Sequence, residues 1–512
     1  MPTKYDAIII GSGFGGCMTA YKLIGSGLKV LMLERGDWVQ RGPENWEANQ
    51  TLELTPQYDN TSALRVEAGG NKPLMGQYSC VGGPSVYYGG VSFRFRAADF
   101  NPPEDIIGDS GAQWPISYDD LEPFYDEAEK LLNISGESGV DPTEPHRNQA
   151  YPQKVGALAE VSVKVKQSAE KLGLKPFQLP LAINYHDHNR STCQNCTTCD
   201  TFACAVSAKN DLATMIIPDL IEKGMELRPN CLVLSLERSG SRITEVKCID
   251  KSTNQTITFQ ADKVILSGGA LASPALLLSS GLDQNNRGGD LIGRYLMRHL
   301  NAIIFGIYPG AADKEKRFHK QIAILDYYFG HPSLKTNFTK IGSLQQIPTP
   351  NPGIVENEVK GILGKTLGKA VKLLTGLLAI AEDQPQYSNR LWVDSSKKDK
   401  YDLPQPVIFH QYSKRDKEAL KLLINPAKKI INGTGALAHY VHHIRTFSHA
   451  VGTVRMGENP QTSVLDRNCQ FRGLDNLWVV DGSFMPASAA VNPSLTIAAN
   501  ALRVGGEISE KK

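Results

Sequence analysis

The chain has 512 residues, of which 41% are hydrophobic and 21% are charged, a balance that excludes a wholly disordered, collagen-like or coiled-coil protein. At roughly 150 residues per domain, this length allows about three domains, or two larger interleaved ones. The 55 basic and 53 acidic residues nearly cancel, so no basic excess indicates nucleic-acid binding, and no nucleic-acid partner is expected.

The N-terminal segment alternates between apolar and glycine-rich stretches. Residues 5–10 form an apolar run typical of a buried parallel strand. The glycine-rich turn 11–16 follows at once, and a helical pattern then leads into a second strand pattern that ends at Glu34. Strand, glycine turn, helix, strand and acid, in this order, are typical of a dinucleotide-binding unit.

Each part of this unit has a physical role. Gly11 permits the tight turn, Gly13 lets the backbone approach a pyrophosphate, and Gly16 lets the helix pack on the strand. The helix N-terminus offers unpaired N–H groups to a diphosphate, and the acid can accept hydrogen bonds from a ribose. The cofactor-binding residues expected here are Gly11, Gly13, Phe14, Gly15, Gly16 and Glu34. The unit alone does not separate FAD from NAD.

A second glycine-rich loop spans residues 81–90, and its Gly83 and Ser85 are suited to close contact with a flat or charged ligand. Residues 301–430 alternate strand-like and helical stretches and contain no motif typical of cofactor binding. This region is the best candidate for a substrate domain inserted into a cofactor domain. The C-terminal stretch returns to glycine turns, a strand at 477–480 and a helix at 493–503.

Seven segments together resemble one family, and they are spread over the whole chain. They are GSGFGG at 11–16, VGGPSVYYGG at 81–90, WPISYDDLEPFY at 114–125, VILSGGALASPALLLSSG at 264–281, LIGRYLMRHL at 291–300, SHAVGTVRMG at 448–457 and VVDGSFMPASAAVNPSLTIAANALR at 479–503. The chain resembles the glucose–methanol–choline (GMC) oxidoreductases, especially their bacterial cholesterol-oxidase and sugar-dehydrogenase branches. This resemblance, rather than any spacing, implies FAD as the cofactor.

The resemblance also implies the fold class and the domain order. We expect an α/β protein with a doubly wound, Rossmann-like FAD-binding domain assembled from separated segments, plus a sheet-containing α+β substrate domain. Residues 1–300 are expected to form the FAD-binding domain, with a cysteine-rich loop at about 186–209. Residues 301–440 would form the substrate domain. Residues 441–512 would return to the FAD domain.

The resemblance places a catalytic pair, His449 and Asn492, at the flavin face. Alcohol oxidation removes a hydroxyl proton and transfers a hydride to flavin N5. A neutral imidazole can accept the proton, since its ordinary pKa is about 6.5. An amide can donate a hydrogen bond to the developing alkoxide. Also by resemblance, Val233, Asp481 and Pro493 are expected to contact the cofactor, with Asp481 bonding the ribityl or pyrophosphate region.

Two departures and one absence qualify this picture. Tyr88 stands where cholesterol-oxidase relatives carry an asparagine that faces the flavin, and Pro84 replaces a more usual glycine or serine. No histidine or cysteine lies in a recognised flavin-linkage motif, so noncovalent FAD is expected. The histidines His439, His442 and His443 lie near the catalytic segment, but a strand-like pattern makes them surface groups or neighbours of the site.

Four cysteines crowd into a short segment of a chain that has only nine. Cys193, Cys196, Cys199 and Cys204 could bring four thiolates round one metal centre. The last gap is one residue longer than in the ferredoxin run, and no Cys-Pro follows. Three interpretations stay open: an iron–sulfur cluster, a zinc or other structural metal, and disulfides or free thiols. A reducing cytoplasm argues against disulfides.

Residues 361–381 carry a helical stripe of leucines opposite Lys365, Lys369 and Lys372. This pattern favours a helix packed on the substrate domain over a mobile or membrane-touching cover. The N-terminus lacks a secretory signal pattern, and no apolar run is long enough to span a membrane, so a cytoplasmic location is expected.

The sequence therefore predicts FAD-dependent oxidation of a small-molecule alcohol to a carbonyl compound, with His449 as the base. Sugar, aminosugar, sterol and other hydroxyl substrates stay open, and so does the electron acceptor, which could be oxygen, a quinone or a redox protein. The same fold also supports lyases and a photodecarboxylase, and an electron-transfer flavoprotein is a third class.

Overall fold

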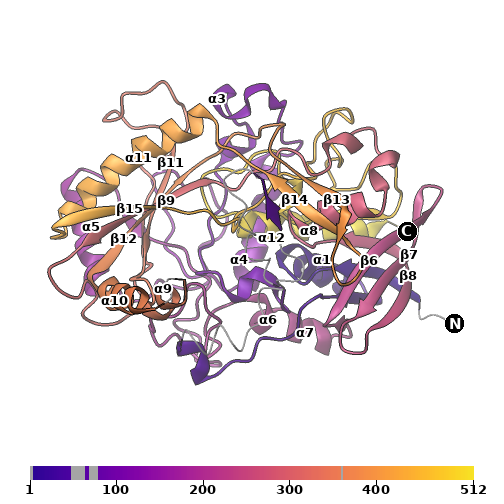
Figure 1. Ribbon diagram of the computed structural model, residues 1–512, viewed down its shortest axis with the longest axis horizontal. Coiled ribbons are helices and arrows are strands. Elements are labelled where there is room, and N and C mark those ends of the chain that lie inside the picture. The colour runs from indigo at the N-terminus through magenta and orange to yellow at the C-terminus, as the bar shows by residue number, and fades with distance from the viewer. Residues whose placement is uncertain (1–3, 48–63, 68–78, 359–360, 512) are drawn as a thin grey trace.

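The computed structural model describes residues 4–47, 64–67, 79–358 and 361–511. Two sheet-containing parts lie side by side in Figure 1, with both chain termini on the right-hand part. The right-hand part holds a seven-stranded sheet in the order β5-β2-β1-β8-β7-β6, with β16 also paired to β8. Its strands are β1 (Lys4–Ile10), β2 (Val30–Leu33), β5 (Glu226–Arg228), β6 (Cys231–Ser239), β7 (Arg242–Asp250), β8 (Gln255–Leu266) and β16 (Leu477–Val479).

The centre of this sheet is parallel and built from distant segments. Strand β1 pairs in parallel with β2 on one side and with β8 on the other, and β16 pairs in parallel with β8. The strands β6 and β7 are antiparallel additions at one edge. This arrangement is the expected doubly wound domain assembled from separated segments, and helices must cover both faces because parallel strands are buried on both sides.

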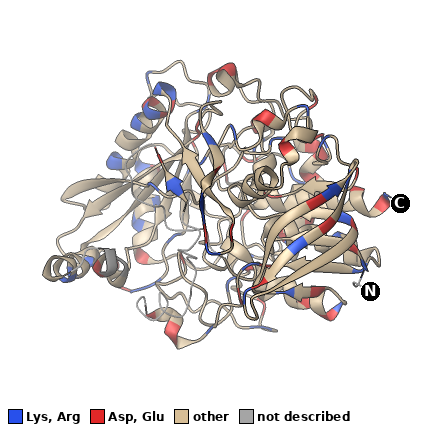
Figure 2. Cartoon of the chain, turned by 45° about the vertical axis from the view of Figure 1, so that its right-hand side comes forward, with Lys and Arg blue, Asp and Glu red and all other residues tan. Residues whose placement is uncertain are grey.

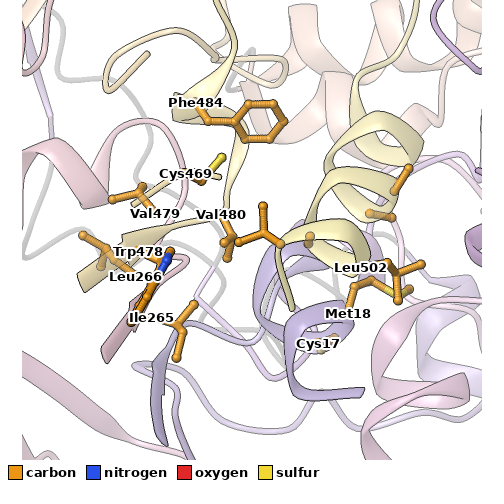
Figure 3. Packing of buried hydrophobic residues seen from close by; sticks show 14 of the residues in the cluster. Cys17, Met18, Ile265, Leu266, Cys469, Trp478, Val479, Val480, Phe484 and Leu502 are labelled. Carbon is orange, nitrogen blue, oxygen red and sulfur yellow. The ribbon is translucent and has the colours of Figure 1, made fainter. Parts of the chain in front are cut away.

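Helices α1 (Phe14–Gly25) and α12 (Ser494–Glu510) pack against each other beside this sheet, and α4 (Tyr118–Leu131) packs on α12. Figure 3 shows the resulting core, where Met18 of α1 meets Leu502 of α12 close to Val480, which follows β16. All three side chains are fully buried. The first and last helices of the chain therefore share one core, which fixes the C-terminal segment next to the N-terminal glycine turn.

The second sheet is antiparallel, in the order β15-β9-β12-β11-β10-β4. Its strands are β4 (Phe177–Gln178), β9 (Leu300–Ile307), β10 (Ile322–Ile324), β11 (Gly342–Ile347), β12 (Leu374–Ala381) and β15 (Ala438–His443). Helices α11 (Lys414–Asn432) and α5 (Glu160–Lys171) cover one face of it. Figure 2 shows basic residues along α11, whereas the strands beneath it are drawn largely in tan.

A three-stranded sheet and several short helices complete the described chain. The small sheet contains β3 (Arg65–Val66), β13 (Arg390–Lys398) and β14 (Pro404–Phe409). The short helices are α3 (Glu104–Ile107), α6 (Leu212–Met215), α7 (Ile217–Glu222), α8 (Ala272–Ser279), α9 (Pro352–Glu358) and α10 (Ile362–Ala370). None of the described helices combines the length and the apolar composition that a bilayer-spanning helix needs.

The single helix predicted over residues 361–381 is wrong in its second half. Helix α10 ends at Ala370, a 3-10 turn follows, and the remainder is the strand β12. Strand β12 lies inside the sheet, so side chains on both of its faces are buried, and a continuous apolar run there does not mark one face of a helix. In α10 itself, Ile362 is 86% exposed and Leu363 is 62% exposed.

Candidate active site

The glycine turn between β1 and α1 has the shape expected for nucleotide binding. Gly11 has a φ of +102°, and a Cβ there would lie 2.3 Å from the Ser267 carbonyl oxygen at the end of β8. A Cβ on Gly15 would lie 2.4 Å from the Val480 carbonyl oxygen. By contrast, a Cβ on Gly13 would meet nothing within 4 Å. The turn is closely packed on the protein side and open at Gly13, where a pyrophosphate would approach.

Helix α1 begins at Phe14 without a side-chain cap on Gly13. Its first amide N–H groups have no acceptor within the helix by geometry, so they are available to a diphosphate. The second glycine-rich loop reaches the same place, because a Cβ on Gly83 would lie 3.3 Å from the Gly13 Cα. The ring of Tyr88, from this second loop, lies 5.7 Å from the Phe14 ring. The structure thus brings together the two loops that the sequence singled out.

Glu34 directly follows β2 and holds the first glycine-rich loop in place. Its Oε2 accepts hydrogen bonds from the Ser12 backbone N–H at 3.1 Å and the Ser12 hydroxyl at 2.6 Å. Its Oε1 accepts one from the Gly36 N–H at 2.9 Å. A carboxylate oxygen has two acceptor positions, so a ribose hydroxyl can still bond here. Ser85 has a structural contact in addition, since its hydroxyl accepts a hydrogen bond from the Leu212 N–H.

His449 and Asn492 lie together, as the sequence predicted. His449 Nε2 is 3.4 Å from the Asn492 amide nitrogen Nδ2. The amide is held from behind, because Asn492 Oδ1 accepts a hydrogen bond from Gln345 Nε2 on β11 at 2.9 Å. The second sheet therefore orients Asn492 so that its donor side faces the histidine. Helix α12 starts two residues after Asn492.

A second histidine, His299, controls the protonation of His449. His299 Nε2 lies 3.1 Å from the Ser488 carbonyl oxygen, which only accepts, so this nitrogen carries the proton. In neutral His299, Nδ1 is then an acceptor, and it lies 3.0 Å from Nδ1 of His449. His449 must donate from Nδ1, which leaves its Nε2 as a free base beside Asn492.

Both imidazoles are neutral near pH 7. Burial, together with the neighbouring His299 and the Lys320 ammonium, lowers the pKa of His449 to about 3. Burial also lowers the pKa of His299. Asp383 works in the opposite direction on both groups. A neutral base next to a nearby carboxylate can accept a proton during reaction without being protonated beforehand.

Asp383 holds the backbone that carries His299. The carboxylate accepts hydrogen bonds from the Arg298 N–H at 2.8 Å and the His299 N–H at 3.1 Å, and from the Ser488 hydroxyl at 3.0 Å. His299 has a φ of +61°, a region that a non-glycine residue enters at a cost and keeps only when neighbours fix it. Burial raises the pKa of Asp383, but the neighbouring His410, whose Nε2 lies 3.8 Å from Oδ2, together with His299 and the Arg298 N–H, holds this pKa below its usual value.

A partly buried ion pair, Lys320 with Asp200, acts on His449 from nearby. Lys320 Nζ is 2.7 Å from Asp200 Oδ2. A Cβ on Gly89 would lie 3.0 Å from Lys320 Nζ, so this pair packs against the second glycine-rich loop. Asp200 belongs to the cysteine-rich loop, and Lys320 lies two residues before the start of β10. The ion pair therefore joins that loop to the second sheet beside the site.

Asp481, Val233 and Pro493 are the remaining residues expected to bind the cofactor, and their contact with FAD stays a prediction. Asp481 is buried and accepts hydrogen bonds from the Gly269 N–H, the Ser483 N–H and the hydroxyls of Ser273 and Ser483. Burial raises the pKa of Asp481. Val233 lies on β6 and is buried, and Pro493 caps the start of α12.

The four clustered cysteines do not form a metal site among the residues that the structure describes. There, no group of three or more His, Cys, Asp or Glu side chains is arranged to hold a metal ion. All four are free thiols. Burial raises the pKa of Cys193 to about 11 and that of Cys199 well above its usual value. The Lys209 ammonium donates to the carbonyl oxygens of Tyr88, Cys199 and Phe202, so the cysteine loop is fastened to the second glycine-rich loop.

The residues of the site that were not predicted from the sequence include His299, Gln345, Lys320 and Asp383. His299 lies in the segment 291–300 that supported the family resemblance, so a second buried histidine there was a signal. Gln345 and Lys320 lie in stretches without a motif. Only the place of β11 within the second sheet brings Gln345 to Asn492.

Comparison with known proteins identifies the family. The N-terminal GMC oxidoreductase model matches residues 5–301 and the C-terminal one matches 385–501. The chain is 31% identical to paromamine 6'-oxidase of Streptomyces fradiae over 98% of this chain and 90% of that protein. It is 30% identical to 6'''-hydroxyparomomycin C oxidase of Streptomyces lividus, over 99% of this chain and 91% of that protein.

The fold agrees with this assignment. The structure of pyridoxine 4-oxidase from Mesorbium loti superposes with a TM-score of 0.69 over 98% of each chain, at 19% identity. The chain therefore belongs to the GMC oxidoreductase family, and the predicted FAD-dependent alcohol oxidoreductase is confirmed at this level.

Proposed function

We propose that this protein oxidises the hydroxyl group of a small-molecule alcohol to a carbonyl group, with His449 as the base. The observation that carries the proposal is the free Nε2 of His449, which faces the Asn492 amide at 3.4 Å and belongs to an imidazole whose proton is fixed on Nδ1 by His299. A base and a donor converging on one point are what proton removal from an alcohol requires.

The two glycine-rich loops would hold FAD, and the fit is supported by the open space at Gly13 and the uncapped start of α1. The expected binding residues are Gly11, Gly13, Phe14, Gly15, Gly16, Glu34, Gly83, Ser85, Val233, Asp481 and Pro493. When bound, FAD supplies the acceptor for the hydride at N5.

The protein's own residues handle the proton. As the carbinol C–H bond breaks and its electron pair leaves as a hydride, the hydroxyl proton passes to His449 Nε2 and the C=O bond forms. Asn492 donates its N–H to the oxygen that loses the proton. Asp383 favours the imidazolium that results, because its negative charge lies in the same buried network. His299 keeps Nε2 of His449 unprotonated before each turnover.

The names of the relatives support hydroxyl substrates. Paromamine 6'-oxidase and 2-methyl-1,2-propanediol dehydrogenase of Mycolicibacterium austroafricanum are both related along nearly the whole chain, the second at 26% identity over 99% of this chain and 95% of that protein. One relative is called an oxidase and the other a dehydrogenase, so oxygen, a quinone and a redox protein all stay possible acceptors for this chain. A lyase and a photodecarboxylase are less favoured, because the relatives named here are called oxidases and dehydrogenases. An electron carrier is less favoured, because it needs no base–amide pair.

We further propose that residues 1–300 and 441–512 form the FAD domain and 301–440 the substrate domain. The parallel sheet supports the first part, and β9, β10, β11 and β12 support the second. From the first segment, β4 and α5 also pack on the second sheet. A metal at Cys193, Cys196, Cys199 and Cys204 rests on sequence spacing alone.

A panel of alcohols tests the function. The protein with its FAD is mixed with each alcohol without oxygen, and the visible absorbance of the oxidised flavin is followed. Bleaching by at least one alcohol supports the proposal. Absence of bleaching by sugars, aminosugars, sterols and aliphatic alcohols alike would contradict it. Repeating turnover with oxygen, a quinone and a dye then identifies the acceptor class.

A further inference from the structure

The second sheet shows one face to α11 and α5 and the opposite face to the catalytic pair. The register separates the two faces, because directly paired residues point to the same side and neighbours along a strand alternate. Leu344 and Leu377 belong to the core under α11. Gln345, which bonds Asn492, therefore points the other way. We call this opposite side the Gln345 face.

A row of paired residues runs across the Gln345 face from the active site toward the edge of the sheet. Gln345 pairs with Leu378, Leu378 pairs with Ile303, and Ile303 pairs with His442 on the edge strand β15. Gln345 is fully buried and Leu378 is 8% exposed, Ile303 is half-buried, and His442 is exposed. The row thus leads outward from the catalytic pair to solvent.

The next row on the same face is also apolar. Ile347, Gly376, Phe305 and Tyr440 are paired in sequence across four strands. Phe305 and Tyr440 have stacked rings with centroids 6.4 Å apart. Ile347, Leu378 and Phe305 form one apolar cluster, and each keeps 6–8% exposure, unlike the fully buried residues of the α11 side.

The Gln345 face carries no charge on its strands. Among the residues of the six strands, all of which the structure describes, those on this face include no Asp, Glu, Lys or Arg. They are Phe177, Asn301, Ile303, Phe305, Ile307, Ala323, Ser343, Gln345, Ile347, Leu374, Gly376, Leu378, Ile380, Ala438, Tyr440 and His442.

The strands of the Gln345 face offer no carboxylate to a cationic substrate. The Lys320 ammonium and the Asp383 carboxylate shift the pKa of His449 in opposite directions. Asp200 already pairs with Lys320 at 2.7 Å. An ammonium group brought to this wall would lose hydration without gaining a carboxylate, which is costly. An apolar group would instead gain from leaving water.

We infer that the substrate is an uncharged alcohol whose non-reacting part is apolar, and that this part lies along the Gln345 face from Leu378 to Phe305. The inference rests on the proposed function, since it names the substrate class of the same site. It separates this chain from any relative that takes an aminosugar.

The test compares straight-chain alcohols with one charged analogue. Anaerobic flavin reduction is measured with butan-1-ol, hexan-1-ol, octan-1-ol and 6-aminohexan-1-ol, and kcat/KM is taken for each. We expect kcat/KM to rise up to about fourfold for each added methylene, since burying one CH2 contributes about 0.8 kcal/mol. We expect 6-aminohexan-1-ol to be at least about tenfold poorer than hexan-1-ol, because a buried ammonium is left unpaired.

Paired variants test whether the substrate lies along the Gln345 face. Leu378→Ala should flatten the dependence on chain length, whereas Leu377→Ala, the next residue on β12, points toward α11 and should keep it. Ile303→Asp, at the half-buried position, should shift the preference toward 6-aminohexan-1-ol about tenfold or more, by supplying the missing carboxylate. FAD content and thermal unfolding show which variants are folded, and Ile303→Asp carries the test if Leu378→Ala is not.

The outcomes separate this inference from the proposed function. No bleaching by any alcohol would overturn both. Bleaching by aminosugars or 6-aminohexan-1-ol at least as fast as by hexan-1-ol would overturn the inference and leave the function intact. A chain-length dependence that is unchanged in Leu378→Ala, with an unchanged preference in Ile303→Asp, would place the apolar part of the substrate elsewhere and overturn the inference too.

Discussion

The Nδ1 atoms of His299 and His449 lie 3.0 Å apart, and only one tautomer of each ring satisfies all the hydrogen bonds between Ser488 and His449. This series of hydrogen bonds starts at the Ser488 carbonyl oxygen, passes through both imidazole rings and ends at the free Nε2 of His449. A fixed backbone acceptor thus decides which nitrogen of the catalytic base is available. His299 does not touch the reacting position, so it is a positioning residue.

Replacing His299 tests this tautomer control. A glutamine can accept from His449 Nδ1 with its oxygen and donate to Ser488 with its amide, whereas a leucine can do neither. We expect His299→Leu to slow flavin reduction by about 10–10²-fold, the range for losing an orienting partner. His299→Gln should recover most of that loss. The pH dependence of flavin reduction should change in the leucine variant only, and equal rates and pH profiles in both variants would exclude the tautomer role.

The hydrogen bond from Gln345 to Asn492 orients the amide that faces His449. Asn492→Ala removes the donor to the developing alkoxide and should slow flavin reduction by about 10²–10³-fold. Gln345→Leu leaves the donor in place but frees its orientation, so we expect a smaller loss of about tenfold. Stopped-flow reduction under anaerobic conditions measures both. If Gln345→Leu proved as damaging as Asn492→Ala, the glutamine would have a direct contact with the substrate instead.

Protein stability should fall as the pH drops below the ordinary histidine pKa. The unfolded chain takes up a proton at His449 near pH 6.5, whereas the folded chain does so only near pH 3. The unfolded state therefore binds more protons between these values, and stability is lost as pH falls through this window. From pH 6.5 to 5.5, His449 alone should cost about 1 kcal/mol. Urea unfolding of wild type and His449→Gln at both pH values isolates this share, and identical losses in the two proteins would refute it.

The cysteine loop and the cofactor are tested by one preparation. Protein purified without oxygen should show the absorbance of flavin alone, because the described thiols are not arranged round a metal. Acid precipitation should release the yellow colour into solution, as expected for noncovalent FAD. Iron and acid-labile sulfide in stoichiometric amounts would instead support an iron–sulfur cluster at the four cysteines. Stoichiometric zinc would support a structural metal there. Colour retained in the pellet would indicate a covalent link.

The cofactor half of the fold could be predicted because its signals are local. The glycine spacing from Gly11 to Gly16 and the acid Glu34 lie within one strand–helix–strand unit, whose geometry is set by neighbours in sequence. The strand boundaries found for β1, β2 and β16 agree with the apolar runs. The helix predicted over residues 374–381 was wrong because a continuous apolar run has no periodicity that distinguishes a buried strand from a buried helix.

The candidate site could be predicted only for residues that lie in the segments resembling the family. His449 and Asn492 came from such segments, whereas Gln345 reaches Asn492 across 147 residues through the pairing of an antiparallel sheet. His299 is 150 residues from His449. Contacts of this kind depend on register and on the packing of two domains, which no local pattern encodes.

The role of His449 as the base is the central claim, and anaerobic flavin reduction in His449→Ala tests it most directly. Wild type and variant are loaded with FAD and mixed with an alcohol that reduces the wild-type flavin, and the bleaching rates are compared. We predict a loss of about 10²–10⁴-fold with unchanged FAD content, since general base help is removed and other segments hold the nucleotide. A variant that is reduced at the wild-type rate would contradict the account.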